Sequence, residues 1–437
     1  MRSFATVSAL DTIGEVTRND RYDACVVGGA GHVGAPLAIV MATHGIRTLV
    51  HDIDGRALET IAGGRLPFLD DGGEPALRAA LDAGMLGFTS EYEKTRGIPV
   101  IIVTIGTPID EFHNPVLRAV TDCVDLLIPH LSDDQTLILR STVFPGVTEL
   151  VHEHLRARGK QAKLAFCPER VVQGQATREL QSLPQIVSGM TPEAEEVAAD
   201  IFLRFAPKVV RMSPKEAEFA KLFSNAYRYI QFAAANQFYV MVESEGLDYR
   251  RVLTGLKADY PRLRDLPGPG FAAGPCLYKD TLQLASFANN QFALGQAAIN
   301  INEGLPDFII GQLRKRFALQ QLTVGILGMA FKADSDDTRS SLSYKLRRLL
   351  RVRAREVLTT DPFVRTDPTL LPIEEVIDRS DLLIVGVPHS GYRSVDLRGK
   401  PVVDLWGIFG GSILPEPGPG GVAQDTIVTS GAARRTS

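Results

Sequence analysis

The segment Pro267–Asp280 (PGPGFAAGPCLYKD) contains the residues best suited by type and spacing to covalent chemistry. Cys276 follows a run of small residues that leaves room for a ligand, and we expect it to open a helix. A helix N-terminus and the nearby Lys279 would both stabilise a thiolate, which is the nucleophilic form of cysteine. Most cysteines are buried structural residues, but the glycine loop and the Lys279-Asp280 pair favour a catalytic role here.

The other three cysteines, Cys25, Cys123 and Cys167, lie within apolar strand or helix patterns, where we expect buried core thiols. The four cysteines are far apart and form no CxxC pair. This spacing is typical of reduced thiols in the cytoplasm, and it favours neither disulfides nor a zinc site. We therefore expect no metal and a cytoplasmic location.

A second motif, Gly29-Ala30-Gly31-His32-Val33-Gly34, matches GxGxxG. It directly follows an apolar strand pattern, Asp23–Gly28, and begins a helical pattern. In such loops the glycines allow a tight turn, close approach of the backbone to a pyrophosphate, and close packing of helix on strand. Asp52 ends the next strand pattern, where an acid binds a ribose hydroxyl and repels a 2′-phosphate. The motif predicts an NAD site, with a glycine-rich turn of some other α/β protein as the alternative.

Two further polar groups have weaker signals. Lys221 and Asn225 are four residues apart in a helical pattern and so share a face, from which they could orient a substrate and stabilise an oxyanion. The spacing alone equally fits a solvated helix face. Glu169 follows a strand pattern and could act as a general base, although an isolated glutamate in a loop is usually a surface residue.

Alternating strands and helices over residues 1–211 predict a doubly wound parallel sheet that would position the glycine loop. The expected strands are Asp23–Gly28, Arg47–Asp52, Val100–Ile105, Thr136–Leu139 and Lys163–Cys167.

Residues 212–318 are predicted to form a mostly helical connector. Lys215–Glu245 contains neither Pro nor Gly and has apolar residues at helical spacing, which indicates one long helix. After the Pro/Gly-rich loop Pro261–Pro275, a second helical stretch is expected over Leu277–Ala318, broken or kinked at Pro306.

Residues 319–410 are predicted to form a second, smaller α/β domain, and the Gly/Pro/Ser/Thr-rich tail 411–437 is expected to be disordered. The expected strands of this domain are Leu322–Gly328, Glu356–Thr359, Asp381–Val387 and Val402–Leu405. The fold class is thus α/β, with two Rossmann-like doubly wound parallel-sheet domains joined by a central helical connector.

Composition excludes several classes of protein. The 437 residues are 45% hydrophobic and 22% charged with a net charge of -4, which is ordinary for a globular protein and disfavours nucleic-acid binding. We expect neither a membrane-spanning segment nor a signal peptide, because the apolar runs are short and charges interrupt the first twenty residues.

Seven motifs in order resemble those of the UDP-glucose/GDP-mannose dehydrogenase family, the nucleotide-sugar 6-dehydrogenases. Besides the GxGxxG loop they are Gly106-Thr107-Pro108, Ser141-Thr142-Val143 with Pro145-Gly146, Pro168-Glu169-Arg170 with Gly174 and Ala176, Glu218–Leu222 with Asn225, Cys276 with Lys279-Asp280, and Gly328–Lys332 with Asp336-Asp337 and Arg339.

The resemblance implies a four-electron oxidation of the C6 alcohol of a nucleotide sugar to a carboxylate, with two NAD. Lys221, Asn225 and Asp280 would hold a water and stabilise an oxyanion during the first hydride transfer. Cys276 would form a thiohemiacetal and then a thioester, which is hydrolysed with Glu169 as base and Thr142 positioning the water. The cofactor-binding residues implied are Gly29, Gly31, His32, Val33, Gly34, Asp52, Thr107, Pro108, Thr142 and Lys279.

The resemblance also implies that the C-terminal α/β domain binds a nucleoside diphosphate. The substrate-binding residues implied are Glu169, Arg170, Lys221, Asn225, Arg262, Phe271, Lys332 and Arg339. The central helix would pair two subunits in a homodimer, and higher oligomers are possible. The uronate product suggests a role in polysaccharide biosynthesis.

The sequence departs from the family pattern at several positions. Ala273 and Pro275 replace the first of two paired glycines and the Ser or His before the cysteine, Ser340 stands in place of a Glu, and Asp70-Asp71 stand near another usual Glu. The substrate signals are mixed. Arg170 and Pro267–Gly270 resemble the UDP-N-acetylhexosamine branch (UDP-N-acetylmannosamine or UDP-N-acetylglucosamine), whereas Lys279-Asp280 resembles the UDP-glucose branch. We favour the UDP-N-acetylhexosamine branch.

Two hypotheses of other classes remain open. A two-electron 2-hydroxyacid or 6-phosphogluconate-type dehydrogenase would share the long helix and the Lys–Asn pair but would need no Cys276. An inactive NAD-sensing scaffold would explain Ala273 and Pro275 as lost catalytic features.

Overall fold

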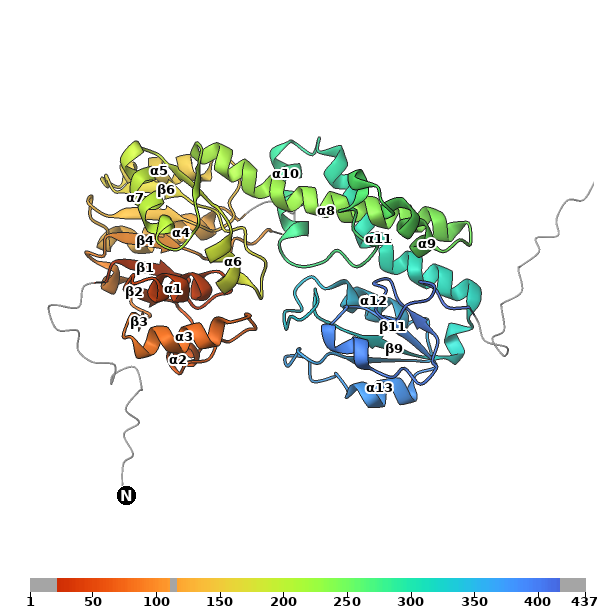
Figure 1. Cartoon of the computed structure of the whole chain (residues 1–437). Helices are drawn as coiled ribbons and strands as arrows, with labels where there is room; N and C mark the ends of the chain where they lie inside the picture. Colours follow the sequence, from red (N-terminus) through yellow and green to blue (C-terminus); the bar gives the residue numbers. More distant parts are fainter. Residues whose placement is uncertain (1–21, 111–115, 417–437) are drawn as a thin grey trace, which may run out of the picture. The chain divides into compact units, whose positions relative to one another are not determined.

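The computed structural model describes residues 22–110 and 116–416 and divides the chain into two compact units (Figure 1). Unit 1 contains the described residues up to Tyr227 together with Lys279–Phe292. Unit 2 contains Arg228–Tyr278 and the described residues from Ala293 onward. The helical middle of the chain, predicted as a domain of its own, therefore contributes to both units. Residues 417–437 of the predicted disordered tail lie outside the described ranges.

Unit 1 is built on an eight-stranded sheet in the order β3-β2-β1-β4-β5-β6-β7-β8. Five of these strands lie where the sequence predicted them, whereas β3, β7 and β8 were not predicted. The strands are β1 (Ala24–Val27), β2 (Thr48–His51), β3 (Leu86–Thr89), β4 (Val100–Val103), β5 (Thr136–Leu139), β6 (Lys163–Phe166), β7 (Gln185–Gly189) and β8 (Val209–Arg211).

Helices cover both faces of this sheet, as expected for a doubly wound fold. Ala24 and Val26 of β1 belong to one core cluster with residues of α1 and α7, while Cys25 and Val27 belong to another with residues of α4 and α5. The alternation follows from the two-residue period of a strand. The helices are α1 (Gly34–Thr43), α2 (Gly55–Ala62), α3 (Gly73–Asp82), α4 (Arg118–Leu127), α5 (Val147–Ala157), α6 (Ala176–Ser182) and α7 (Pro192–Leu203).

The pairings of this sheet are parallel, as predicted, except that β7 runs antiparallel to β6. Two consecutive antiparallel strands are joined at one end of a sheet. The connection between β6 and β7, residues 167–184, therefore stays at the carboxyl end of the parallel strands. Asp70 anchors this connection, accepting hydrogen bonds from the backbone N–H groups of Ala176 (2.9 Å) and Thr177 (3.1 Å). The connection contains Glu169 and Arg170, which are thereby placed at the edge where α/β sheets bind ligands.

Four helices form the middle of the chain: α8 (Pro214–Ser244), α9 (Tyr249–Lys257), α10 (Leu277–Phe287) and α11 (Ala293–Arg316). Although α8 has 31 residues, no helix in the described ranges is long and apolar enough to cross a membrane. The expected break at Pro306 is wrong, because α11 continues through this proline. The chain breaks instead at residues 288–292, where Asn289 and Asn290 adopt positive φ and the N–H of Asn290 bonds to the carbonyl of Ala285. That is the usual end of a helix with a left-handed residue.

Unit 2 contains a four-stranded parallel sheet in the order β10-β9-β11-β12, with α12 and α13 on opposite faces (Figure 1). All four strands were predicted. The folded part extends past the predicted boundary at residue 411, because Ile413 and Leu414 are buried in the core cluster of α12. The elements are β9 (Thr323–Leu327), α12 (Leu342–Arg351), β10 (Glu356–Thr360), α13 (Ile373–Arg379), β11 (Leu382–Val385) and β12 (Val402–Val403).

Candidate active site

The loop after β1 is shaped by glycines at which a side chain does not fit. A Cβ on Gly29 would lie 2.7 Å from the carbonyl oxygen of Val26, and one on Gly34 would overlap the backbone of Gly28. A Cβ on Gly31 would meet only the Gly28 oxygen, at 3.4 Å, so this position faces open space. The loop therefore has the shape that lets a pyrophosphate approach the backbone.

The start of α1 is suited to bind an anion. Val33 occupies the N-cap position and supplies no side-chain hydrogen bond to the first N–H groups of the helix. These N–H groups carry the positive end of the helix dipole. His32 lies in the same loop and stacks on Phe68, with ring centroids 4.2 Å apart.

Asp52 follows β2 and has unused hydrogen-bonding capacity. Its Oδ2 accepts a hydrogen bond from the N–H of Ala30 (2.9 Å), and its Oδ1 accepts one from the N–H of Asp54 (3.0 Å). Because a carboxylate offers about four acceptor positions, room remains for the hydroxyl groups of a ribose. The side chain is half-buried. The glycine loop and Asp52 therefore fit the adenosine diphosphate part of NAD.

Three of the predicted cofactor residues are in contact: Thr107 after β4, Thr142 after β5 and Lys279 in α10. The hydroxyl of Thr107 donates to the carbonyl oxygen of Thr142 (2.6 Å). The ammonium group of Lys279, in the first turn of α10, donates to the carbonyl oxygen of Thr107 (3.2 Å) and lies 3.3 Å from its hydroxyl. Pro108 is in the same segment, and its carbonyl accepts from the N–H of Val116.

Asn225 and Asp280 form a buried polar pair between α8 and α10. The Nδ2 of Asn225 donates to Oδ2 of Asp280 at 2.6 Å, and Nζ of Lys279 lies 3.2 Å from Oδ1 of the same carboxylate. Lys221 lies one turn before Asn225 and is half-buried. The structure thus joins two predicted oxyanion groups and leaves Lys221 on the preceding turn of the same helix.

Glu169 is held by an arginine that the sequence analysis missed. Arg140, fully buried at the end of β5, donates from Nε (3.1 Å) and from a terminal nitrogen (2.5 Å) to Oε2 of Glu169. Oε1 accepts from the N–H groups of Arg170 (2.6 Å) and Val171 (2.9 Å). These bonds use all of the roughly four acceptor positions of the carboxylate. Glu169 is 7% exposed and locked in place.

Arg170, in the connection between β6 and β7, and Arg262, in the loop after α9, are the two predicted substrate arginines outside the C-terminal domain. The structure holds them differently. The guanidinium of Arg170 donates to the carbonyl of Pro184, and burial followed by repulsion from Arg140 lowers its pKa. Arg262 is exposed in a short 3₁₀ helix, η4 (Pro261–Leu263), and lies 5.6 Å from the ring centre of Tyr260. Arg170 is therefore fixed to its own connection, whereas Arg262 faces solvent.

Cys25, Cys123 and Cys167 are buried, as predicted, and Cys276 is exposed. Burial raises the pKa of Cys25, that of Cys123 to about 11 and that of Cys167 to about 12, so these groups stay protonated. Cys276 directly precedes α10, where the helix dipole favours a thiolate.

The loop before Cys276 retains the one glycine that its backbone requires. Gly274 has φ +103°, and a Cβ there would lie 2.5 Å from the ring of Phe331. Ala273, the departure from the family pattern, is not among the described residues with positive φ. The missing glycine at 273 therefore imposes no backbone strain. Phe271, which was predicted to bind substrate, is 5% exposed and belongs to the core cluster of unit 2.

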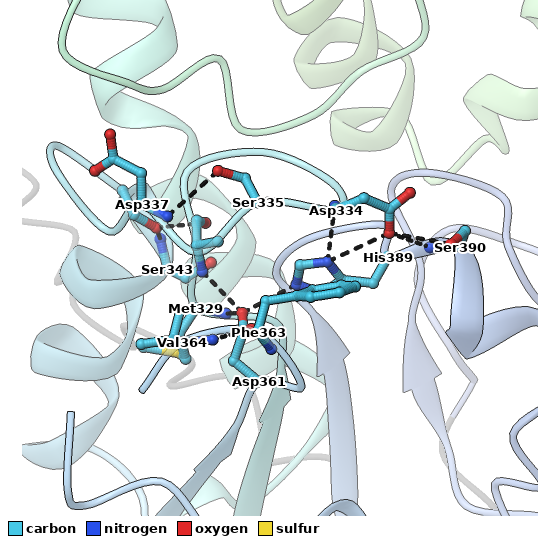
Figure 2. A network of polar contacts seen from close by, with 12 residues as sticks. Met329, Asp334, Ser335, Asp337, Ser343, Asp361, Phe363, Val364, His389 and Ser390 are labelled. Carbon is cyan, nitrogen blue, oxygen red and sulfur yellow. Dashed lines mark hydrogen bonds and ion pairs between the residues drawn. The ribbon is translucent and has the colours of Figure 1, made fainter. Parts of the chain in front are cut away.

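In unit 2, Asp361 follows β10 as Asp52 follows β2. Its Oδ2 accepts hydrogen bonds from the N–H groups of Met329 (2.7 Å) and Ala330 (2.9 Å), and its Oδ1 accepts from Phe363 and Val364. Figure 2 shows these bonds converging on the buried carboxylate. Burial alone would raise the pKa of Asp361, but the bonds from His389 and the backbone outweigh it and lower the pKa to about 2.

His389 connects Asp361 to the loop after β9. Its Nδ1 accepts the N–H of Asp334 (3.0 Å), so the proton of the neutral ring is on Nε2, which donates to Asp361 (2.9 Å; Figure 2). Asp334 in turn accepts from the N–H (2.9 Å) and hydroxyl (3.1 Å) of Ser390. The loop 328–341 is thus tied at both 329–330 and 334.

This loop presents the two predicted substrate residues of the C-terminal domain. Lys332 is half-buried. Arg339 is bonded to Asp337 through Nε (3.0 and 2.9 Å) and a terminal nitrogen (2.6 Å). Its pKa is raised chiefly by that hydrogen bond and further by the charges of Asp337 and Cys276.

Arg140, Asp361 and His389 are functional candidates that sequence reasoning did not single out. Asp361 ends a strand in the same manner as Asp52, which was a usable signal. Arg140 and His389 follow apolar strands. Their partners are 29 and 28 residues away, respectively, and no local pattern predicts such contacts.

Family models match three consecutive parts of the chain. Residues 23–206 match the NAD binding domain of the UDP-glucose/GDP-mannose dehydrogenase family, residues 215–304 its central domain, and residues 325–411 its UDP binding domain.

Similar proteins include UDP-N-acetyl-D-mannosamine dehydrogenase of Pyrococcus horikoshii, 28% identical over 89% of this chain and 95% of the relative. The NDP-N-acetyl-D-galactosaminuronic acid dehydrogenase of Ralstonia nicotianae is 27% identical over 87% and 95%. Among solved structures, the Pyrococcus enzyme superposes with a TM-score of 0.82 at 27% identity, covering 91% of this chain and 97% of its own. A UDP-glucose dehydrogenase of Pyrobaculum islandicum superposes with a TM-score of 0.81 at 28% identity, covering 90% and 96%.

Proposed function

The chain belongs to the UDP-glucose/GDP-mannose dehydrogenase family, and on that premise we propose that it oxidises the C6 alcohol of a UDP-N-acetylhexosamine to the uronate, through a thioester on Cys276. The observation that carries the proposal is the exposed Cys276 directly before α10, whose first turn contains Lys279 and Asp280. A two-electron dehydrogenase has no use for such a thiol.

In the first oxidation, Asn225 and Asp280 hold a water together with Lys221 and stabilise the alkoxide that develops at C6. The 2.6 Å bond between Asn225 and Asp280 orients both groups before substrate arrives. NAD⁺, when bound, accepts the hydride that leaves C6 in each oxidation. The product of the first step is an aldehyde.

In the second oxidation, the Cys276 thiolate adds to the aldehyde carbon and the oxygen takes a proton, which gives a thiohemiacetal. Loss of a hydride and a proton leaves a thioester, whose C–S bond is cleaved by water to release the carboxylate and the thiol. Thr142 positions that water and Glu169 accepts its proton. Because the acceptor positions of Glu169 are occupied, one of its four hydrogen bonds has to be released at this step.

The choice of substrate rests on Arg170 and on the relatives. Those that act on N-acetylated sugars include the Pyrococcus and Ralstonia enzymes. The similar Pyrobaculum structure is a UDP-glucose dehydrogenase, so UDP-glucose is the alternative substrate. Lys332 and Arg339 would bind the diphosphate.

The assembly is proposed to be a homodimer through α8. Large apolar side chains that are exposed recur along this helix at helical spacing. They are Phe223, Tyr227, Phe238 and Met241. We further propose a cytoplasmic enzyme that supplies uronates to polysaccharide synthesis.

A panel of four substrates tests the function: UDP-N-acetylmannosamine, UDP-N-acetylglucosamine, UDP-glucose and GDP-mannose, each followed by NADH absorbance. We expect the highest kcat/KM with one of the two N-acetylated sugars. A preference for UDP-glucose would overturn the substrate assignment, and inactivity with all four would overturn the proposed reaction.

A further inference from the structure

Asn236 of α8 binds the loop that leads to Cys276. Its side chain is 0% exposed. The N–H of Gly270 donates to Oδ1 of Asn236 (2.8 Å), and Nδ2 of Asn236 donates to the carbonyl oxygen of Gly270 (3.0 Å). An antiparallel strand makes the same pair of hydrogen bonds with the N–H and C=O groups of one residue. The Asn236 carboxamide therefore satisfies both backbone groups of Gly270, a residue that lies outside the two sheets.

A second asparagine holds the first in this orientation. The remaining N–H of Asn236 donates to Oδ1 of Asn302 (2.9 Å) on α11, and Nδ2 of Asn302 donates to the carbonyl of Tyr229 (3.1 Å). Rotation of the Asn236 amide would leave buried polar groups unpaired, at a cost of about 1–3 kcal/mol for each group. The amide is thus fixed in the orientation that matches Gly270.

The loop is also held by the burial of Phe271 in the core of unit 2 and by two contacts of its glycines. Gly270 also faces the ring of Trp406, which a Cβ would overlap, so the backbone lies close to this indole. Four residues further on, the N–H of Gly274 bonds to the carbonyl of Ser340 at 3.4 Å, a long hydrogen bond. Cys276 follows two residues later. The pair between Asn236 and Gly270 is therefore the strongest polar anchor of this loop among the hydrogen bonds described here.

We propose that Asn236 is a positioning residue for Cys276, and that it sets the loop so that the sulfur reaches the aldehyde formed in the first oxidation. The proposal rests on the proposed function, because it concerns the second half of that reaction. Misplacement of a reacting group by about 1 Å can cost about 100-fold in rate. Loss of the anchor should accordingly slow capture of the aldehyde by the thiolate far more than it affects the first hydride transfer.

The test compares Asn236→Ala with the matched control Asn302→Ala. Both remove the same side chain from the same buried network, but only the first removes the bonds to Gly270. With limiting nucleotide sugar and excess NAD⁺, Asn236→Ala should yield fewer than two NADH per sugar, and hydroxylamine should trap free aldehyde. Asn302→Ala loosens the orientation of Asn236 but keeps both groups that bond to Gly270, so its yield should lie closer to two than that of Asn236→Ala. Equal ratios in the two variants would overturn the proposal.

Two further measurements keep the result interpretable. The rate of Cys276 alkylation by iodoacetamide should change in Asn236→Ala and change less in Asn302→Ala. An unchanged rate in Asn236→Ala contradicts the proposal even if the sugar chemistry is misassigned. If Asn236→Ala does not fold, Asn236→Asp keeps the volume and the acceptor but loses the donor to Gly270, and its NADH yield decides in the same way. A wild-type yield of one NADH would instead refute the proposed function.

Discussion

Asp52 in unit 1 and Asp361 in unit 2 occupy equivalent places, each following the strand that lies beside the first strand of its sheet. Asp52 accepts two hydrogen bonds and is half-buried. Asp361 accepts bonds from four backbone N–H groups and from His389, and it is 7% exposed. The first acid can therefore bind a ligand, whereas the second has no capacity left.

This difference shows how one strand–loop–helix arrangement serves two purposes. Where the carboxylate keeps open acceptor positions, the loop after the first strand can accommodate a nucleotide. Where the carboxylate is saturated, it fixes the backbone of that loop, here residues 328–341 with Lys332 and Arg339. The four predictions that follow separate the cofactor-binding role of unit 1 from the loop-fixing and covalent roles of unit 2.

The largest effect is expected from Cys276→Ala, because it removes the nucleophile of unit 2 and leaves the glycine loop of unit 1 intact. Uronate formation should fall by at least about 10³-fold, while the Kd for NAD, measured by calorimetry, should remain at the wild-type value. Retained uronate formation would favour a two-electron dehydrogenase. Cys123→Ala is the matched control, since that thiol is buried outside the predicted site.

Asp361→Asn should destabilise the protein without changing the KM for NAD. The pKa of Asp361 is lowered to about 2, below its value in an unfolded chain, so its ionised form stabilises the native state above about pH 4 by about 2 kcal/mol. That contribution is lost as the pH falls from about 4 towards 2. Urea unfolding from pH 7 to pH 3 should show a smaller acid-dependent loss in the variant, and parallel curves would contradict this.

Asp52→Asn is the complementary substitution: it should change the KM for NAD and leave the stability of the protein nearly unchanged. Loss of the charge that binds the ribose should raise the KM for NAD by about tenfold and lessen the discrimination against NADP. The urea midpoint should stay near that of the wild type, because Asp52 accepts two hydrogen bonds within the described ranges, fewer than Asp361 accepts. A drop in stability as large as that of Asp361→Asn would abolish the proposed distinction between the two acids.

The smallest effect is expected from two substitutions of His389. In His389→Gln, the side-chain amide reaches the position of Nε2 and keeps the hydrogen bond to Asp361. In His389→Asn, the shorter amide reaches the position of Nδ1 and keeps an acceptor for the N–H of Asp334. If the tie at Asp334 positions the substrate loop, His389→Gln should raise the KM for the nucleotide sugar by about threefold to tenfold, and His389→Asn should raise it less. Equal values would mean that the ring only fills space.

The features that the sequence predicted correctly are local. The placement of the glycine loop between β1 and α1, the long α8, the strands of the second sheet and the three buried cysteines each depend on residues within one element and its neighbour. The break at residues 288–292 was missed because Asn289 and Asn290 signal a helix end more weakly than glycine does, while Pro306 is accommodated within α11. Arg140 and Asn236 were missed because their partners are 29 and 34 residues away.

The central claim is that one site performs both oxidations through Cys276. It is tested most directly by counting NADH per uronate when a limiting amount of the best UDP-sugar of the panel is consumed with excess NAD⁺. Two NADH for each uronate, with no aldehyde released, is the predicted result. One NADH for each sugar consumed would contradict it.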